Sequence, residues 1–245
     1  MEINEEFTIG EVVAKDYRTA SVFESLGIDF CCKGNRTINE VCETRDIDSR
    51  DLLEDIKKVL QEPEITAIND YGSWALDKLA QFIEDKHHKY VEKQIPVIKQ
   101  YLDKICSVHG KEHPELFKVQ GLFNASAGEL TMHMKKEELI LFPFIKKIAT
   151  IKDINDKITR PHFDSVKIPI QMMMDEHTSE GERFEKINEI TEDYKLPRDA
   201  CGTFRICYEH LKEFEEDLHL HIHLENNILF PKAIELEKKV YGEDV

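Results

Sequence analysis

Apolar residues recur every three to four positions along most of this chain, which is the spacing of one buried face of an α-helix. The pattern predicts four long helices, over residues 73–108, 114–149, 162–194 and 198–240. Because short connections make consecutive long helices antiparallel, these segments are expected to form an up-down four-helix bundle. Proline lacks an amide donor, so kinks or local breaks are expected at Pro96 and Pro169.

The first 60 residues carry shorter patterns of the same kind. An amphipathic stretch from Ile9 to Leu26 stops at Gly27, which is typical of a helix end. The sequence TINE has the form of a capping box and predicts a second helix from about Thr37. Residues 49–60 place Leu, Ile and Val on one stripe and predict a third helix. Together these elements predict a small three-helix domain.

The composition agrees with an all-α fold. Of the 245 residues only 10 are glycine and 8 are proline, and 33% are charged, which favours helices over turn-rich β structure. Residues 61–72 contain Pro63 and lack a clear stripe, so they are interpreted as a linker. The predicted organisation is a helical domain over residues 1–60, this linker, and a bundle over residues 73–245.

The charge of the chain restricts its partners. A formal net charge of −16 disfavours nucleic acid and anionic membrane surfaces, because both attract basic proteins. The acidic start, MEINEEF, lacks the features of a secretory signal, and no apolar run approaches the roughly 18 residues of a spanning helix. The chain is therefore expected to be cytoplasmic, with its six cysteines reduced. The sequence does not distinguish a monomer from a homodimer.

One pattern occurs twice, as HMKKEELILFP from His133 and as HIHLENNILFP from His221. Residues i and i+4 share one helix face, so His133 and Glu137 point the same way, as do His221 and Glu225. The Leu-Phe-Pro that follows each pair is interpreted as packing. In the histidine-rich segment HLHIHLE, the spacing to Leu-Phe-Pro favours His221 over its neighbours as the inward residue.

Each of the two pairs is preceded by another histidine at nearly the same distance. These histidines are His88 and His177, which lie on the first and third predicted helices of the bundle. The constellation of four histidines and two glutamates suits a pair of iron or manganese ions, because imidazole and carboxylate are intermediate-to-hard donors. Six ligands are too many for one tetrahedral ion, and the lack of thiolate argues against structural zinc.

Four further residues are candidates for a functional role, and each also has an ordinary structural explanation. Glu129 lies one turn before His133, and Glu176 directly precedes His177, so either carboxylate could support a ligand or carry protons. In a very acidic chain both could equally be surface groups. The adjacent Cys31 and Cys32 could be redox or iron-transfer thiols, or two ordinary reduced thiols beside a helix end.

These motifs resemble those of the hemerythrin-like HHE domains, in particular HMKKE, DEH and HIHLE. The whole chain is similar to the ScdA-type iron–sulfur cluster repair di-iron proteins, because GIDFCCKGNRTINEVC resembles their N-terminal domain and LENNILFP resembles their bundle. The resemblance implies two non-haem iron ions with oxo and carboxylate bridges. It implies terminal histidine ligands and bridging glutamates, namely His88, His133, His177, His221, Glu137 and Glu225.

The resemblance also implies a function and leaves alternatives. The expected activity is repair of iron–sulfur clusters damaged by nitric oxide or oxidants, with iron donated to the damaged proteins. Cys31 and Cys32 would belong to the functional motif of the N-terminal domain. One alternative is a di-iron nitric oxide reductase or peroxide scavenger, which a proton route through Glu129 or Glu176 would favour. Another is a module that senses or stores oxygen, nitric oxide or iron.

Overall fold

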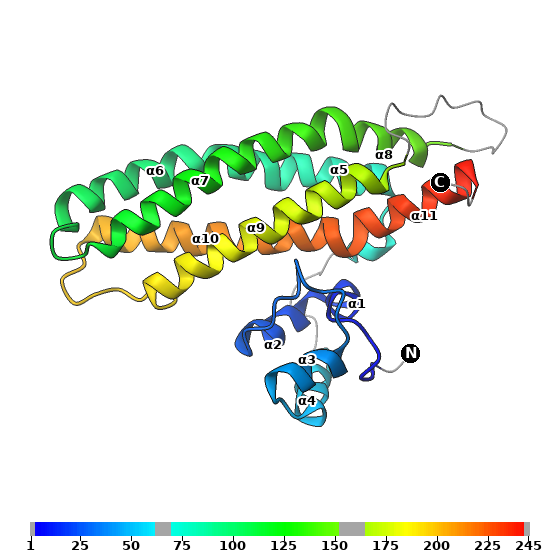
Figure 1. Cartoon of the computed structure of the whole chain (residues 1–245), viewed down its shortest axis with the longest axis horizontal. Helices are drawn as coiled ribbons and strands as arrows, with labels where there is room; N and C mark the ends of the chain where they lie inside the picture. The colour runs from blue at the N-terminus through cyan, green and yellow to red at the C-terminus, as the bar shows by residue number, and fades with distance from the viewer. Residues whose placement is uncertain (1–2, 62–69, 152–164, 243–245) are drawn as a thin grey trace.

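The computed structural model describes residues 3–61, 70–151 and 165–242. Within these ranges, four helical rods lie side by side (Figure 1). Three of the rods contain a π-helical segment between two α-helices. In chain order the rods are α5 Leu76–Ile83, π-segment Glu84–His88 and α6 Lys89–His109; α7 Glu115–Lys136, π-segment Glu137–Leu141 and α8 Phe142–Ala149; α9 Lys167–Thr191; and α10 Gly202–Leu224, π-segment Glu225–Leu229 and α11 Phe230–Tyr241.

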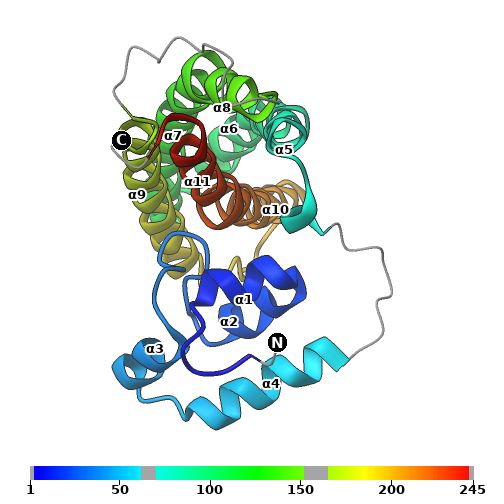
Figure 2. The ribbon, with the colours of Figure 1, turned by 90° about the vertical axis from the view of Figure 1, so that its right-hand side faces the viewer.

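The rods form a closed bundle, as the view along its axis shows (Figure 2). Helix α6 packs against α7 and α10, and α9 packs against the same two helices. Consecutive rods run in opposite directions, so the all-α up-down four-helix bundle predicted from the sequence is confirmed. Across the described ranges there is no strand, and a single antiparallel bridge joins Thr8 and Thr37. No helix in these ranges is long and apolar enough to cross a membrane.

Neither Pro96 nor Pro169 breaks its helix. Helix α6 continues through Pro96. Pro169 falls in the first turn of α9, where amide groups have no partner within the helix, so the break expected there does not occur. The predicted start of this rod at His162 lies outside the described residues.

The N-terminal part contains α1 Ile9–Lys15, α2 Ala20–Ser25, α3 Ile38–Arg45 and α4 Ser49–Gln61. The expectation of one continuous helix from Ile9 to Leu26 was wrong. Asp16 has an extended backbone with φ −154°, and its side chain accepts a hydrogen bond from the amide of Arg18, which starts a new turn. The capping box at Thr37 is present as predicted, because Thr37 and Glu40 cap each other's amides.

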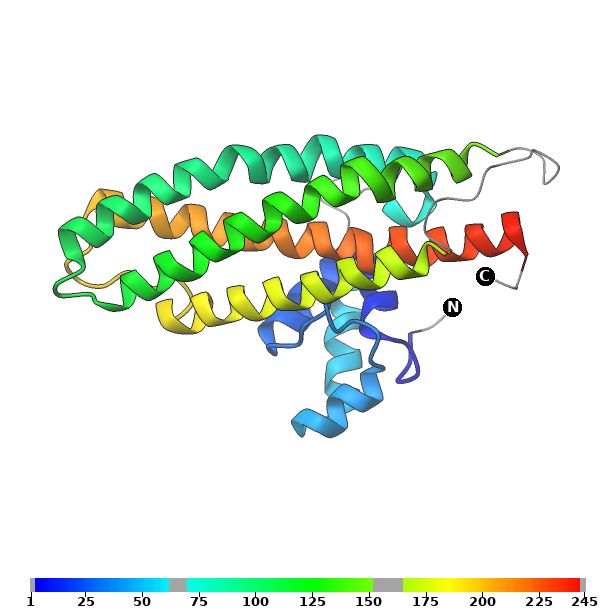
Figure 3. The same cartoon turned by 45° about the horizontal axis from the view of Figure 1, so that its top comes forward.

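The N-terminal helices pack on the side of the bundle formed by α9 and α10 (Figure 3). Helix α1 contacts α10 and the π-segment that follows it. The close approach needs glycine at two places: a β-carbon on Gly10 or on Gly34 would collide with the side chain of Asn227 or with neighbouring backbone. Buried hydrophobic residues of the N-terminal part, including Phe23 and Phe30, join one cluster with residues of the bundle.

Two hydrophobic clusters fill the bundle and leave a polar layer between them. One cluster ends at residues such as Val91, Leu130 and Ile222, and the other begins at residues such as Ile83 and Leu141. The buried histidines and glutamates of the repeated motif lie between these two ends. The apolar clusters seal the polar layer from water along the bundle axis.

Candidate metal centre

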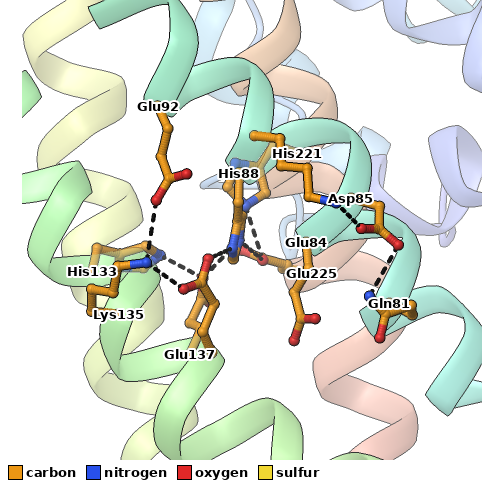
Figure 4. Close-up of polar contacts among 12 residues, drawn as sticks. Gln81, Glu84, Asp85, His88, Glu92, His133, Lys135, Glu137, His221 and Glu225 are labelled. Carbon is orange, nitrogen blue, oxygen red and sulfur yellow. Dashed lines mark hydrogen bonds and ion pairs between the residues drawn. The ribbon is translucent and has the colours of Figure 1, made fainter.

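Six residues converge in the polar layer, one or two from each rod. They are His88 from the first rod, His133 and Glu137 from the second, His177 from the third, and His221 and Glu225 from the fourth. None is more than 3% exposed. Figure 4 labels five of them, the two glutamates and the histidines His88, His133 and His221. The structure therefore brings together all six residues that the sequence singled out as ligands.

The six residues divide into two groups of four that share both glutamates. One group is His88, Glu137, His221 and Glu225, and the other is His133, Glu137, His177 and Glu225. In each group the candidate ligand atoms all lie within 4.8 Å of one another. A shared pair of carboxylates between two sets of histidines is the arrangement that bridges two cations in a bundle core.

The Nε2 atoms of the histidines face the glutamate oxygens. His221 lies 3.0 Å from Glu225 Oε1, and His177 lies 3.0 Å from Glu225 Oε2. His88 and His133 each lie 3.4 Å from Glu137 Oε2. The four nitrogens therefore face the carboxylate oxygens that the two groups share.

Each glutamate begins a π-helical segment. The amide of Phe142 donates to the carbonyl of Glu137, and the amide of Phe230 donates to the carbonyl of Glu225, which are i to i+5 bonds. The proline that follows each Phe has no amide, so the wider turn ends where an ordinary helical bond would be missing anyway. The leucine and phenylalanine of each Leu-Phe-Pro segment are buried, as expected of packing residues, whereas Pro143 and Pro231 are exposed and end the wider turns.

The buried carboxylates require positive charge nearby. Neither oxygen of Glu137 has a hydrogen-bond donor among the described residues, although both are fully buried. Burial and the charge of Glu225 favour the neutral form of Glu137, yet His133 and His88 hold its pKa below the ordinary value. The pKa of Glu225 is likewise held well below its usual range by His221 and His177, against the effect of burial. The buried imidazole and carboxylate groups of this site therefore suit the binding of cations.

The histidines respond to the same charges. Burial lowers the pKa of His88, but its contacts with Glu137 and Glu225 outweigh burial and raise it to about 10. His133 is raised to a pKa of about 10 in the same way, chiefly by the charge of Glu137. A cation must displace these protons to bind, so metal affinity should fall as the pH decreases.

The outer nitrogens of three histidines are anchored by hydrogen bonds. Nδ1 of His133 lies 2.8 Å from Glu176, which also pairs with Lys136. Nδ1 of His88 lies 3.0 Å from Glu138. Such bonds place the proton on Nδ1 and turn the lone pair of Nε2 toward a metal. The hydrogen bond with His133 holds the pKa of Glu176 at about 2, so this carboxylate is charged.

Nδ1 of His177 is anchored by Asn226 Oδ1, at 2.8 Å. The roles of Glu138 and Asn226 were not predicted from the sequence. Each directly follows a glutamate of the repeated motif, so the position after the glutamate was the available signal.

His221 is supported differently. Its Nδ1 has no hydrogen-bond partner within the described ranges. Its ring stacks on His87, with centroids 5.6 Å apart, and Nδ1 of His87 lies 3.0 Å from Asp217. His223, two residues away, contacts Asn227 instead, and burial lowers its pKa to about 4. The structure thus brings His221 to the group, as the spacing favoured.

The two further carboxylate candidates have different positions. Glu176 contacts a histidine of the group. Glu129 has a side chain that is 60% exposed and pairs with Arg183 at 2.9 Å. Arg183 also pairs with the buried Glu180, which accepts a hydrogen bond from Ser126. The structure therefore places Glu129 in a surface network and not at the histidine–glutamate group.

The loop that carries Cys31 and Cys32, called the cysteine loop, lies against His177 of the histidine–glutamate group. Both amides of Cys31 and Cys32 donate to Asp29, and the two sulfur atoms are 3.7 Å apart. The thiol of Cys32 donates to the backbone carbonyl of His177 at 3.2 Å. The contact between the two thiols and burial raise the pKa of Cys31, so it remains a thiol near neutral pH. No local pattern in the sequence indicates this contact between distant segments.

The six converging histidines and glutamates are called the box from here on. The four-helix bundle and this buried box define a hemerythrin-type cation-binding protein. A family model described as the hemerythrin HHE cation binding domain matches residues 80–233. A second model, described as a domain of unknown function (DUF542, ScdA_N), matches residues 5–60.

Similar proteins combine both parts. The iron–sulfur cluster repair protein ScdA of Staphylococcus haemolyticus is 31% identical over 232 residues, which cover 94% of this chain and 99% of that protein. The iron–sulfur cluster repair protein YtfE of Pectobacterium carotovorum is 31% identical over 230 residues, covering 93% of this chain and 96% of that protein. The chain belongs to this family of HHE proteins with an ScdA-type N-terminal domain.

Proposed function

We propose that this protein holds two iron ions in its buried box and donates iron to iron–sulfur clusters damaged by nitric oxide or oxidants. The observation that carries the proposal is the pair of four-residue groups that share Glu137 and Glu225. His88 and His221 would hold one ion, and His133 and His177 the other, with the two glutamates as bridges. Relatives named iron–sulfur cluster repair proteins support the same function.

The donor set suits release as well as binding. When bound, the iron pair supplies exchangeable ions with positions open to small ligands. Imidazole and carboxylate groups hold iron less firmly than thiolates do, so iron can pass to a damaged cluster with free sulfur ligands. The cysteine loop lies at the His177 end of the box and is the proposed place of transfer or of contact with the damaged protein.

A second candidate function is reduction of nitric oxide or peroxide at the iron pair. The observation in its favour is Glu176, whose side chain is 34% exposed and contacts both His133 and Lys136. This carboxylate offers a proton route between solvent and one histidine of the box. A simple sensor or storage module is less well supported, because it would not need the cysteine loop.

The proposed organisation follows the sequence. We propose that residues 1–60 form a separate domain and that residues 61–72 join it to the bundle, although residues 62–69 lie outside the described ranges. The proposed compartment is the cytoplasm, where the six cysteines, all free thiols in the structure, would stay reduced.

The test compares iron transfer with nitric oxide consumption. The purified protein is loaded anaerobically with ferrous iron and mixed with a cluster-depleted apoprotein plus sulfide, and recovery of the cluster is followed by its absorption. In parallel, nitric oxide consumption is measured with an electron donor. We expect fast cluster recovery and slow consumption. Rapid turnover of nitric oxide without cluster recovery would replace the first function by the second.

The cysteine loop is tested in the same assay. The double variant Cys31→Ala/Cys32→Ala should keep its iron and its optical spectrum but transfer iron more slowly. The matched control is Cys201→Ala, because Cys201 is an exposed thiol at the start of α10, away from the box. If the double variant cannot be loaded with iron, the cysteines act as ligands and the division of roles proposed here is wrong.

A further inference from the structure

One side chain joins the cysteine loop to a histidine of the box. Asn226 is buried on the fourth rod, and its Nδ2 donates to the carbonyl of Cys31 at 3.1 Å. Its Oδ1 accepts the Nδ1 proton of His177 at 2.8 Å. Because the amide uses one end for each contact, it fixes the ring of His177 only while the loop holds the other end in place.

The loop holds His177 from a second direction. The thiol of Cys32 donates to the backbone carbonyl of the same residue. Cys32 also packs on Gly181, one turn further along α9, where an added β-carbon would lie 3.0 Å from its sulfur. The docked loop therefore contacts both the ring support and the backbone of one histidine.

The other half of the box has no such link among the described residues. Glu138, which supports His88, pairs with Lys135 at 2.6 Å on its own rod. His221 rests on His87, which is supported by Asp217. All of these partners belong to the bundle. Loop displacement would therefore disturb His177 and leave the support of His88 and His221 unchanged.

We propose that Asn226 is a positioning residue that couples docking of the Cys31–Cys32 loop to the hold on one metal of the pair. With the loop docked, His177 is oriented toward its metal. When the loop leaves to engage a damaged protein, His177 loses its orientation, and the metal held by His133 and His177 is released before its neighbour. This inference rests on the proposed two-metal centre and assigns which ion is delivered.

The expected size of the effect follows from other metal sites. Loss of a hydrogen bond that orients a ligating histidine typically weakens metal binding about 10–100-fold. Asn226→Ala should therefore release one metal of each pair to a chelator about 10–100-fold faster than the unchanged protein, with the second metal released at nearly the original rate. The unchanged protein should release both metals slowly.

The neighbouring residue supplies a matched control. Nδ2 of Asn227 donates to the carbonyl of Phe30 at 3.1 Å and contacts His223, which is not in either group of four. Asn227 thus joins the same loop to the same rod without reaching a candidate ligand. Asn227→Ala should retain both metals, or lose them far more slowly than Asn226→Ala.

Two further variants separate positioning from general damage. Asn226→Asp removes the donor to Cys31 but gives His177 a charged acceptor, whose hydrogen bond is stronger than that of the neutral amide and can hold the ring without the loop, so release should be slow again. Gly181→Ala crowds Cys32 without touching Asn226 or any candidate ligand, and it should accelerate release of the same single metal several-fold. Adding Gly181→Ala to Asn226→Asp should not change the release rate, because the hydrogen bond that couples the loop to His177 is already absent.

The experiment loads each variant with ferrous iron, adds a chelator that absorbs when it binds iron, and resolves the release into fast and slow phases. Circular dichroism checks that the helices persist. Single-phase release of both metals from Asn226→Ala, or equal effects of Asn226→Ala and Asn227→Ala, would overturn the coupling. If the unchanged protein binds fewer than two metals, the proposed two-metal centre fails instead, and this result is distinguishable from the others.

Discussion

His88 and His177 occupy equivalent places in the two halves of the bundle, yet different groups support them. In both cases the supporting residue directly follows a glutamate of the repeated motif. Glu138 is a carboxylate that lies 3.0 Å from His88, whereas Asn226 is a neutral amide that lies 2.8 Å from His177. The carboxylate of Glu138 makes the Nε2 of His88 a stronger electron-pair donor to a metal. The amide of Asn226 instead has a second end, which reaches the cysteine loop.

The other two histidines differ in the same manner. Glu176 precedes His177 and supports His133, and at the equivalent place His87 precedes His88 and stacks on His221. A charged, partly exposed carboxylate thus supports His133, and a buried ring lies against His221. Each group of four therefore has one histidine supported by a partly exposed carboxylate, and the two groups differ in the other support, which links His177 but not His221 to the N-terminal part. Duplicated ligands do not make two metals equivalent, because the neighbours set how firmly each is held.

The largest expected effect comes from a residue that both halves share. Glu225→Ala should remove nearly all of the metal, because its carboxylate belongs to both groups of four. The helices should persist, since the two hydrophobic clusters remain. Metal analysis after gel filtration and circular dichroism measure the two results. Glu235→Ala, at an exposed glutamate paired with Lys239, is the control. An unchanged metal content in Glu225→Ala would contradict the proposal that Glu225 bridges both metals.

A smaller effect is expected when one half loses its own histidine. His177→Ala and His221→Ala should each lose mainly one metal of the pair, because each residue belongs to only one group. Metal analysis and chelator competition on both variants measure the loss. Equal loss of both metals in each variant would show that neither half can hold a metal alone, and the comparison of halves would lose its meaning.

Removing only the supporting charge should have a moderate effect. Glu176→Gln should weaken the metal at His133, and Glu138→Gln should weaken the metal at His88, each by roughly 10-fold. Gln keeps an acceptor for Nδ1 but loses the negative charge. Stepwise chelator competition on the two variants provides the measurement. Similar release curves, with no difference in which metal leaves, would show that the halves are not independently supported.

The smallest effect on the metals is expected at a thiol far from the box. Cys201 accepts hydrogen bonds from the amide of Phe204 and from His109, which lower its pKa to about 7. Its alkylation by iodoacetamide should therefore rise with pH up to about 7 and then level off, without metal loss. His109→Ala should move this rise to higher pH. Mass spectrometry across a pH series, with metal analysis of the product, checks both. Metal loss on alkylation of Cys201 alone would contradict the separation of this thiol from the box.

Local periodicity explains what could be predicted. The helical rods and the pairing of His133 with Glu137 and of His221 with Glu225 follow from 3.6 residues per turn. The matching offset of His88 and His177 then indicated a box of six residues, which the structure brings together. Some local details were not predicted. Asp16 interrupts the first helix by capping a new turn, and π-helical segments begin at Glu137 and Glu225.

The supports of the box were decided by the tertiary structure. Whether Glu176 or Glu129 reaches a histidine depends on how α7 and α9 are rotated against each other, and both residues looked equivalent in the sequence. The contact of Cys32 with His177, and the bridge through Asn226, join segments far apart in the chain. No periodicity encodes such contacts, because they arise only when separate helices pack at one angle and depth.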